Sequence, residues 1–157
     1  MIKKILLLGN TDLYKRSEEV KKDENLELVI TDLHDTLMNF KKEYKVGRAI
    51  AAPQIGIHKR IIYMYIDKPV VFINPKLTFP YDEKMEVLDD CMSFPNLLVK
   101  VNRYKRCIIE YYDANWDLQQ QELEGDLSEL IQHEYDHLDG ILSTMRAIDN
   151  QSFVIKE

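Results

Sequence analysis

The sequence predicts an α+β protein in which antiparallel β-sheets pack around one central helix near the C-terminal end. Three observations support this fold class. An amphipathic helical pattern comes early, β-branched and aromatic runs fill the middle of the chain, and a second helical segment follows the last of these runs. Strands followed by one late helix are typical of an α+β fold, in which the helix is covered by antiparallel sheet.

The early helix is expected over residues 26–44. Its apolar residues recur three or four positions apart, so they lie on one face, and this stripe is most simply core packing. These residues are Leu26, Ile30, Leu33, Leu37, Phe40 and Tyr44. The segment that follows, residues 47–54, is expected to be a loop.

Five strands are expected after this loop. They cover residues 60–66, 70–79, 97–101, 106–113 and 118–123. The first two join at residues 67–69, and residues 114–116 should form the tip of a hairpin. The late helix is then expected to start near Asp126, a candidate N-cap, and to end at Gly140, where a left-handed residue is wanted.

Composition limits both the size of the protein and its partners. A chain of 157 residues with 45% hydrophobic content can bury one core, so one domain over residues 1–157 is expected. The net charge of −6 argues against a nucleic-acid partner. The apolar run at residues 5–8 is too short to export or anchor the chain. We therefore expect a cytoplasmic protein that contacts no membrane.

The late helix carries the most informative motif, residues 132–140 (QHEYDHLDG). His133 and His137 stand four positions apart on one helical face, with Glu134 beside them. This H-E-x-x-H pattern is typical of metal-dependent hydrolases. The alternative is a surface helix with two solvated histidines.

A third metal ligand has to come from upstream of this helix. One protease group has a histidine where this chain has Ser143, and only two carboxylates follow Gly140. Of the two cysteines, Cys107 lies in a β-branched run and is most simply a small buried apolar residue. Cys91 lies among acidic and turn-forming residues. Its thiolate would complete a Cys, His, His set with the fourth position left to water, as in catalytic sites. Cysteines in such unlike contexts give no disulfide framework and suit a reducing compartment.

Together, three motifs resemble the peptide deformylase family, whose members remove the formyl group from N-formylmethionine at the start of new proteins. Residues 47–54 (GRAIAAPQ) stand where the family has G-x-G-[LI]-A-A-x-Q, and residues 89–93 (DDCMS) where it has E-G-C-L-S. Residues 132–140 match Q-H-E-x-D-H-L-x-G throughout. The resemblance runs from about residue 8 to residue 146.

The resemblance implies a metal-dependent amide hydrolase whose metal-bound water attacks the formyl carbon. Glu134 would move the proton, and the side-chain amide of Gln54 and the backbone N–H of Met92 would stabilise the negative charge on the formyl oxygen. It also implies one divalent ion per chain, Fe²⁺ in the cell, with Zn²⁺, Ni²⁺ or Co²⁺ as alternatives. The expected partners are N-formylmethionyl nascent peptides, with the ribosome as one place of encounter, and the expected oligomeric state is a monomer.

Further residues should support this site. Gln132 and Asp136 flank the histidines and could orient them, because metal-bound histidines usually need a partner for the second ring nitrogen. The resemblance implies that Arg103 pairs with Asp89. The family's glutamate and glycine before the cysteine are replaced here by Asp89 and Asp90.

The pocket for the substrate's first side chain departs from the family pattern. It is expected to include Gly47, Arg48, Ala49, Glu129 and Leu130. Arg48 and Glu129 place charges where the family tends to be apolar. The two charges would most simply pair across the cleft, since an unpaired carboxylate near an apolar pocket is costly. The alternative is that both side chains turn to water.

Two other functions remain open at this point. One is a related hydrolase with a different N-acyl group or first-residue preference, which the charges of Arg48 and Glu129 favour. The other is a non-catalytic metal-binding relative. The complete set of ligands argues against the second, because only catalysis requires Glu134 beside an open metal position.

Overall fold

The computed structural model of the protein describes residues 1–157. The helices are η1 (Thr11–Tyr14), α1 (Glu27–Tyr44), η2 (Ala52–Ile55), α2 (Asp126–Leu138) and η3 (Ser143–Arg146), of which the three η elements are 3-10 helices. The strands are β1 (Ala49–Ala51), β2 (Ile61–Tyr65), β3 (Pro69–Thr78), β4 (Lys84–Asp89), β5 (Leu97–Tyr104), β6 (Arg106–Tyr112), β7 (Leu118–Glu124) and β8 (Phe153–Ile155).

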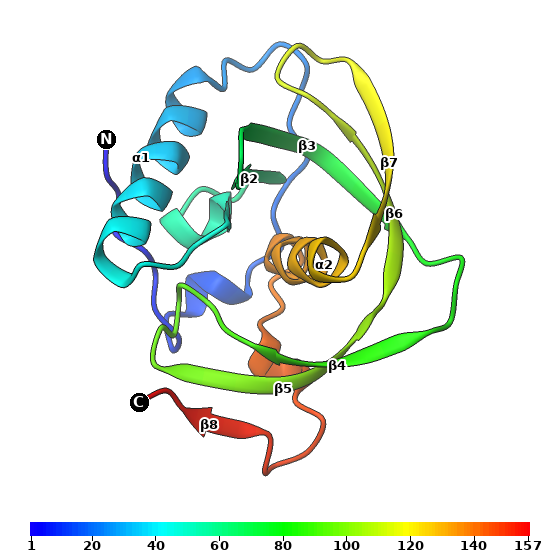
Figure 1. Ribbon diagram of the computed structural model, residues 1–157. Helices are drawn as coiled ribbons and strands as arrows, with labels where there is room; N and C mark the ends of the chain where they lie inside the picture. Colours follow the sequence, from blue (N-terminus) through cyan, green and yellow to red (C-terminus); the bar gives the residue numbers. More distant parts are fainter.

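Two antiparallel sheets surround helix α2 (Figure 1). The larger sheet has the strand order β1-β2-β3-β6-β7 and the smaller one β4-β5-β8. Helix α2 contacts strands of both sheets, whereas α1 lies over β1 and β2 on the outer side of the larger sheet (Figure 1). The expected α+β class, with antiparallel sheets around a C-terminal helix, is confirmed. None of the helices combines the length and apolar character that a membrane crossing would require.

Helix α1 is amphipathic, as its pattern predicts. Leu33 and Leu37 are fully buried against Ile61 and Ile73 of the larger sheet. The helix ends where Lys45 takes a left-handed conformation (φ 62°) and its N–H bonds the carbonyl of Lys41. This end of the helix leads directly into β1.

The opposite face of the larger sheet packs on α2. Ile62 and Phe72 from the sheet meet Ile131 and Leu138 of the helix in a second buried cluster. Cys107 lies in this cluster and is fully buried, in agreement with its interpretation as a small apolar residue. Helix α2 is therefore a core helix rather than a surface helix.

Four expectations for the secondary structure were wrong or incomplete. Residues 47–54 are not a loop, because residues 49–51 pair with β2 and residues 52–55 form η2. Strands β4 and β8 were missed, and β5 continues past residue 101 to Tyr104. Strand β1 is held by pairing with β2, and both β4 and β8 are held by pairing with β5, which local propensity does not reveal. The hairpin tip at residues 114–116 is confirmed between β6 and β7.

The start of α2 also differs from the expectation. The N-cap is Gly125, with φ 61° and ψ −127°, and Asp126 is the first helical residue. Only glycine adopts these backbone angles readily. Gly125 therefore takes the N-cap position, and Asp126 lies in the first turn of the helix instead of at the N-cap. Its negative charge there still favours the positive end of the helix dipole.

The end of α2 is held tightly. Arg60 donates a hydrogen bond to the carbonyl of Leu138 (3.0 Å) and forms an ion pair with Asp139 (3.0 Å). Gly140 has φ 73°, as expected for a residue that ends a helix. A Cβ atom at Gly140 would collide with the backbone carbonyl of Tyr14 in η1. This close approach fixes the C-terminal end of α2 against the N-terminal part of the chain.

The two conformational demands on Gly140 can be separated by substitution. Gly56→Ala introduces a side chain at a similar angle (φ 83°) but into open space, so it should cost about 1 to 2 kcal/mol of unfolding free energy. Gly140→Ala should cost roughly 1 to 3 kcal/mol more, because the collision with Tyr14 adds to the backbone strain. Urea unfolding of both variants measures the difference, and equal losses would show that the close approach does not matter.

Candidate metal centre

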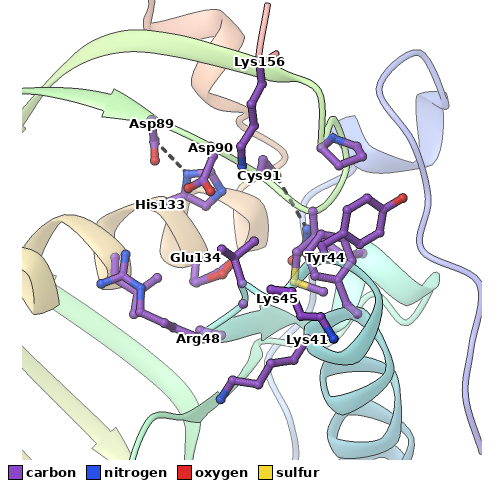
Figure 2. Close-up of a pocket in the computed structure, with 18 of the residues that line it drawn as sticks. Lys41, Tyr44, Lys45, Arg48, Asp89, Asp90, Cys91, His133, Glu134 and Lys156 are labelled. Carbon is purple, nitrogen blue, oxygen red and sulfur yellow. Dashed lines mark hydrogen bonds and ion pairs between the residues drawn. The ribbon is translucent and has the colours of Figure 1, made fainter.

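Helix α2 brings three of the predicted site residues to one buried face. His133, Glu134 and His137 are 6%, 3% and 1% exposed. Cys91 comes from the turn that follows β4 in the smaller sheet, and Gln54 comes from η2, which follows β1 in the larger sheet. The site therefore forms where elements of both sheets meet at α2 (Figure 2).

Cys91, His133 and His137 converge with the geometry of a metal site. Their potential ligand atoms lie within 4.8 Å of one another, and Sγ of Cys91 is 3.4 Å from Nε2 of His137. Ligand atoms at 2.0–2.3 Å from one tetrahedral ion lie roughly 3.3–3.8 Å apart, so small adjustments bring this set around a single ion. One thiolate and two imidazoles suit a divalent transition metal.

The two histidines have different hydrogen-bond partners and different pKa shifts. Nδ1 of His133 lies 2.8 Å from the carboxylate of Asp89, which leaves Nε2 free for a metal. Burial opposes protonation of His133, but the charges of Asp89 and Cys91 hold its pKa well above the usual value, so a metal has to displace a proton from Nε2. Burial and the charge of His133 lower the pKa of His137, so this imidazole is neutral, as a metal ligand has to be. Nδ1 of His137 is buried without a partner in the protein.

A network of ion pairs holds the carboxylate of Asp89 in place. Arg103 donates to Asp89 (3.0 Å) and also to Asp136 (2.7 Å), so the expected pair of Arg103 with the acidic residue before Cys91 is present. Arg146 donates to Asp136 (2.6 Å) from the protein surface. Burial opposes ionisation of Asp89, yet its pKa is lowered because His133 and Arg103 stabilise the carboxylate.

The residues flanking the histidines hold the helix to its surroundings. Gln132 makes hydrogen bonds with both backbone groups of Tyr104 and with Ser128, not with a metal ligand. Asp136 likewise reaches the histidines only through Arg103 and Asp89. Their contacts thus fix the position of α2 against β5, and only Asp89 touches a ligand ring.

Two hydrogen-bond donors lie beside the three ligands. The oxygen of the Gln54 amide accepts the N–H of Ala51 (3.0 Å), so its nitrogen points toward Ser93 Oγ (3.1 Å) and Cys91 Sγ (3.7 Å). The backbone N–H of Met92 makes no hydrogen bond within the protein. Both residues line the same cavity, where they can donate to an oxygen of a bound molecule.

Glu134 lies in the same cavity, so a carboxyl group stands beside the metal ligands and the hydrogen-bond donors. Its burial raises its pKa to about 7. A carboxylate with this pKa can accept a proton and release it again near neutral pH, which is what a general acid and base requires. Figure 2 shows Glu134 in the middle of the cavity, between His133 and Arg48.

The cavity has a volume of about 540 Å³ and opens between α1 and the turn that follows β4. The pocket residues expected from the sequence, Gly47, Arg48, Ala49, Glu129 and Leu130, all line it. Arg48 and Glu129 form an ion pair of 3.2 Å, so the predicted pairing is confirmed. Burial and the charge of Asp89 raise the pKa of Glu129, and Arg48 opposes this shift.

Several residues of the site were not identified from the sequence. Ser93 holds Gln54 through its hydroxyl and donates its N–H to the sulfur of Cys91 (3.5 Å). Its place two residues after Cys91 was the only available signal. Arg146 and Lys156 have no sequence signal at all, and they reach the site only through the fold.

The comparisons with known proteins agree with this geometry. Residues 2–153 match the profile described as Polypeptide deformylase. A peptide deformylase of Thermotoga maritima is 36% identical over 142 residues, which cover 88% of this chain and 83% of the relative. One of Karelsulcia muelleri is 35% identical over an alignment of 163 positions, which covers 99% of this chain and 81% of the relative.

Solved structures show the same fold. The crystal structure of peptide deformylase from Thermotoga maritima superposes with a TM-score of 0.87 at 33% identity, covering 95% of this chain and 99% of that one. A peptide deformylase from Synechococcus elongatus, solved in complex with actinonin, gives a TM-score of 0.85 at 29% identity and covers 94% and 80%. A profile that matches nearly the whole chain and a shared fold lead to one conclusion: the chain belongs to the polypeptide deformylase family.

Proposed function

We propose that this protein hydrolyses the formyl group from the N-terminal formylmethionine of newly made proteins, as one catalytic domain. The observation that carries this proposal is the convergence of Cys91, His133 and His137 with Glu134 beside them in one cavity. A purely structural metal site would need four protein ligands and no buried carboxylate next to it. Action as a monomer in the cytoplasm, on chains leaving the ribosome, stays a prediction.

The metal is proposed to be one Fe²⁺ ion per chain, held by Cys91, His133 and His137. Zn²⁺, Ni²⁺ and Co²⁺ accept the same three ligands. An ion bound there supplies Lewis-acid chemistry, which activates water and polarises the formyl carbonyl. The protein residues contribute the remaining steps.

The free edge of β1 offers a place for the peptide. Backbone groups of neighbouring strand residues point to opposite sides, and the carbonyl of Arg48 accepts the N–H of Tyr65 on β2 (2.8 Å). The N–H and carbonyl of Ala49 therefore face the cavity, which Ala49 lines. An extended peptide can add to this edge by backbone hydrogen bonds, because β1 is the last strand of its sheet.

The proton transfers are assigned to Glu134. When water adds to the formyl carbon, Glu134 accepts a proton from it. The same carboxyl group then delivers the proton to the amide nitrogen as the carbon–nitrogen bond breaks, which yields formate and a free amino terminus. Its raised pKa of about 7 suits both roles near neutral pH.

The negative charge that develops on the formyl oxygen needs donors already in position. The Gln54 amide nitrogen and the Met92 N–H are proposed to supply them. Ser93 and the N–H of Ala51 fix the orientation of the Gln54 amide before substrate arrives. Donors that need no rearrangement during the reaction stabilise the transition state most effectively.

Steady-state assays of the iron-loaded protein test the proposed activity directly. A formyl-methionyl peptide should be hydrolysed, and its acetyl counterpart should react at least about a hundredfold more slowly if binding at the metal selects the smaller acyl group. Release of formate and of the free amine are the two measurements. Preferential hydrolysis of the acetyl peptide would instead indicate a different amide hydrolase.

The ligand assignment predicts a difference between the two cysteines. Cys91→Ala should remove most of the bound metal, and Cys107→Ala should keep about one equivalent, because Cys107 is buried in the apolar cluster between α2 and the larger sheet. Elemental analysis of the two purified variants provides the measurement. A full equivalent of metal in both variants would exclude Cys91 as a ligand.

The role of Glu134 predicts a separation of binding from turnover. Glu134→Gln should keep the fold and the metal but lose at least about a hundredfold in kcat, the usual contribution of a general base. The amide keeps the size of the side chain and cannot accept a proton. Near-normal kcat in a variant with a full metal content would mean that Glu134 is structural.

A further inference from the structure

An ion pair crosses the cavity one helical turn away from the metal ligands. Arg48 precedes the edge strand β1, and Glu129 lies on α2 four positions before His133. Nη2 of Arg48 is 3.2 Å from Oε1 of Glu129. The Glu129 side chain is 11% exposed and the Arg48 side chain 41%, so the carboxylate forms part of the inner wall and the guanidinium part of the rim.

The pair lies one helical turn from His133, within reach of the first side chain of a substrate whose formyl group lies at the metal ligands. The formyl group must reach the metal ligands and Glu134, and the first residue follows immediately after the bond that breaks. One turn of a helix rises about 5.4 Å, which is close to the length of an extended methionine side chain. A side chain that runs along α2 from His133 toward its N-terminal end therefore meets Glu129, with Leu130 beside it.

The pair has unused capacity for hydrogen bonds. Its one hydrogen bond joins Nη2 of Arg48 to Oε1 of Glu129. A guanidinium has five N–H groups and a carboxylate has two oxygens, so both partners keep free positions. None of the free atoms is among the buried polar atoms without a partner, and both residues line the cavity. The wall thus offers donors and acceptors at one place.

We propose that the Arg48–Glu129 pair adapts this pocket to unbranched first side chains of methionine length that end in a polar group. Glutamine and methionine sulfoxide belong to this class. The amide of glutamine can donate to Glu129 and accept from Arg48, and the sulfoxide oxygen can accept from Arg48. Methionine itself still packs against Leu130 and the aliphatic stem of Arg48. The proposal rests on the proposed function, because it concerns the substrate of the same site.

The physical basis is the cost of burying a polar group. An apolar pocket rejects glutamine because the amide loses its hydrogen bonds to water and finds none in the protein. The ion pair replaces those hydrogen bonds, so this penalty becomes smaller. Discrimination between an apolar and a polar side chain of equal length should therefore be weak in this protein.

Peptides that differ only in the first side chain test the proposal. The measurement is kcat/KM of the iron-loaded protein for formyl-norleucyl, formyl-glutaminyl and formyl-methionine-sulfoxide peptides with the same following residues. We expect the two polar substrates to fall within roughly 30-fold of norleucine. A preference for norleucine above roughly a thousandfold would overturn the proposal without any variant.

Substitutions at Arg48 and Glu129 test whether this ion pair causes the weak discrimination between apolar and polar side chains. Arg48→Leu with Glu129→Leu should increase the preference for norleucine at least about tenfold, because the polar wall is lost. The exchanged pair, Arg48→Glu with Glu129→Arg, should restore part of the wild-type ratio. Lys59→Leu with Glu24→Leu removes an ion pair of 2.9 Å outside the cavity and should leave the ratio unchanged.

The experiments distinguish a failure of the proposed function from a failure of the proposed role of the Arg48–Glu129 pair. An inactive wild-type protein on every formyl peptide would contradict the proposed function itself. An active protein whose ratio is the same in the wild type and in the Arg48, Glu129 double variant would contradict only the role of the pair. If the double variant does not fold or does not bind metal, the ratios of the wild type alone decide, since they do not depend on any substitution.

Discussion

The buried contacts of Asp89 with His133 and Arg103 join the candidate metal site to the ion pairs that hold helix α2. Helix α2 carries charged and polar side chains through the protein interior, and each needs a partner there. Arg103 also bonds Asp136 of the same helix, so the smaller sheet is tied to α2 by buried ion pairs. Removing one partner from such a pair costs about 3 to 5 kcal/mol, because the other charge stays buried. The same contact fixes the ring of His133, so the stability of the fold and the geometry of the site are linked.

The site is assembled from parts that no single element could supply. Helix α2 provides two imidazoles and a carboxylate, the smaller sheet provides Cys91, and the larger sheet provides Gln54. The close approach of Gly140 to η1 and the hydrogen bond of Arg60 to the end of α2 hold the helix between the two sheets. The proposed chemistry depends on Glu134, which lines the cavity and whose pKa is raised by burial. In the proposed function, one wall of this cavity serves catalysis and the edge strand β1 binds the substrate.

The sequence predicts those features that depend on local spacing. His133, Glu134 and His137 could be found because three positions of one helix turn determine their relation, and α1 followed from its apolar period. Features that depend on distant contacts could not be found. Strand β8 is held by its pairing with β5, and β1 by its pairing with β2, and each is only three residues long. Ser93 reaches Gln54, 39 positions away in the sequence, only because η2 and the turn after β4 meet at α2.

The proposed metal site holds one ion by Cys91, His133 and His137 and leaves a fourth position open. X-ray absorption of the zinc-loaded Cys107→Ala protein tests this ligand set, because Cys91 is then the only thiol in the chain. One sulfur neighbour at about 2.3 Å and two imidazole nitrogens at about 2.0–2.1 Å are expected, together with one lighter atom from solvent. A spectrum without a sulfur neighbour, or without imidazole, would show that the proposed ligand set is wrong.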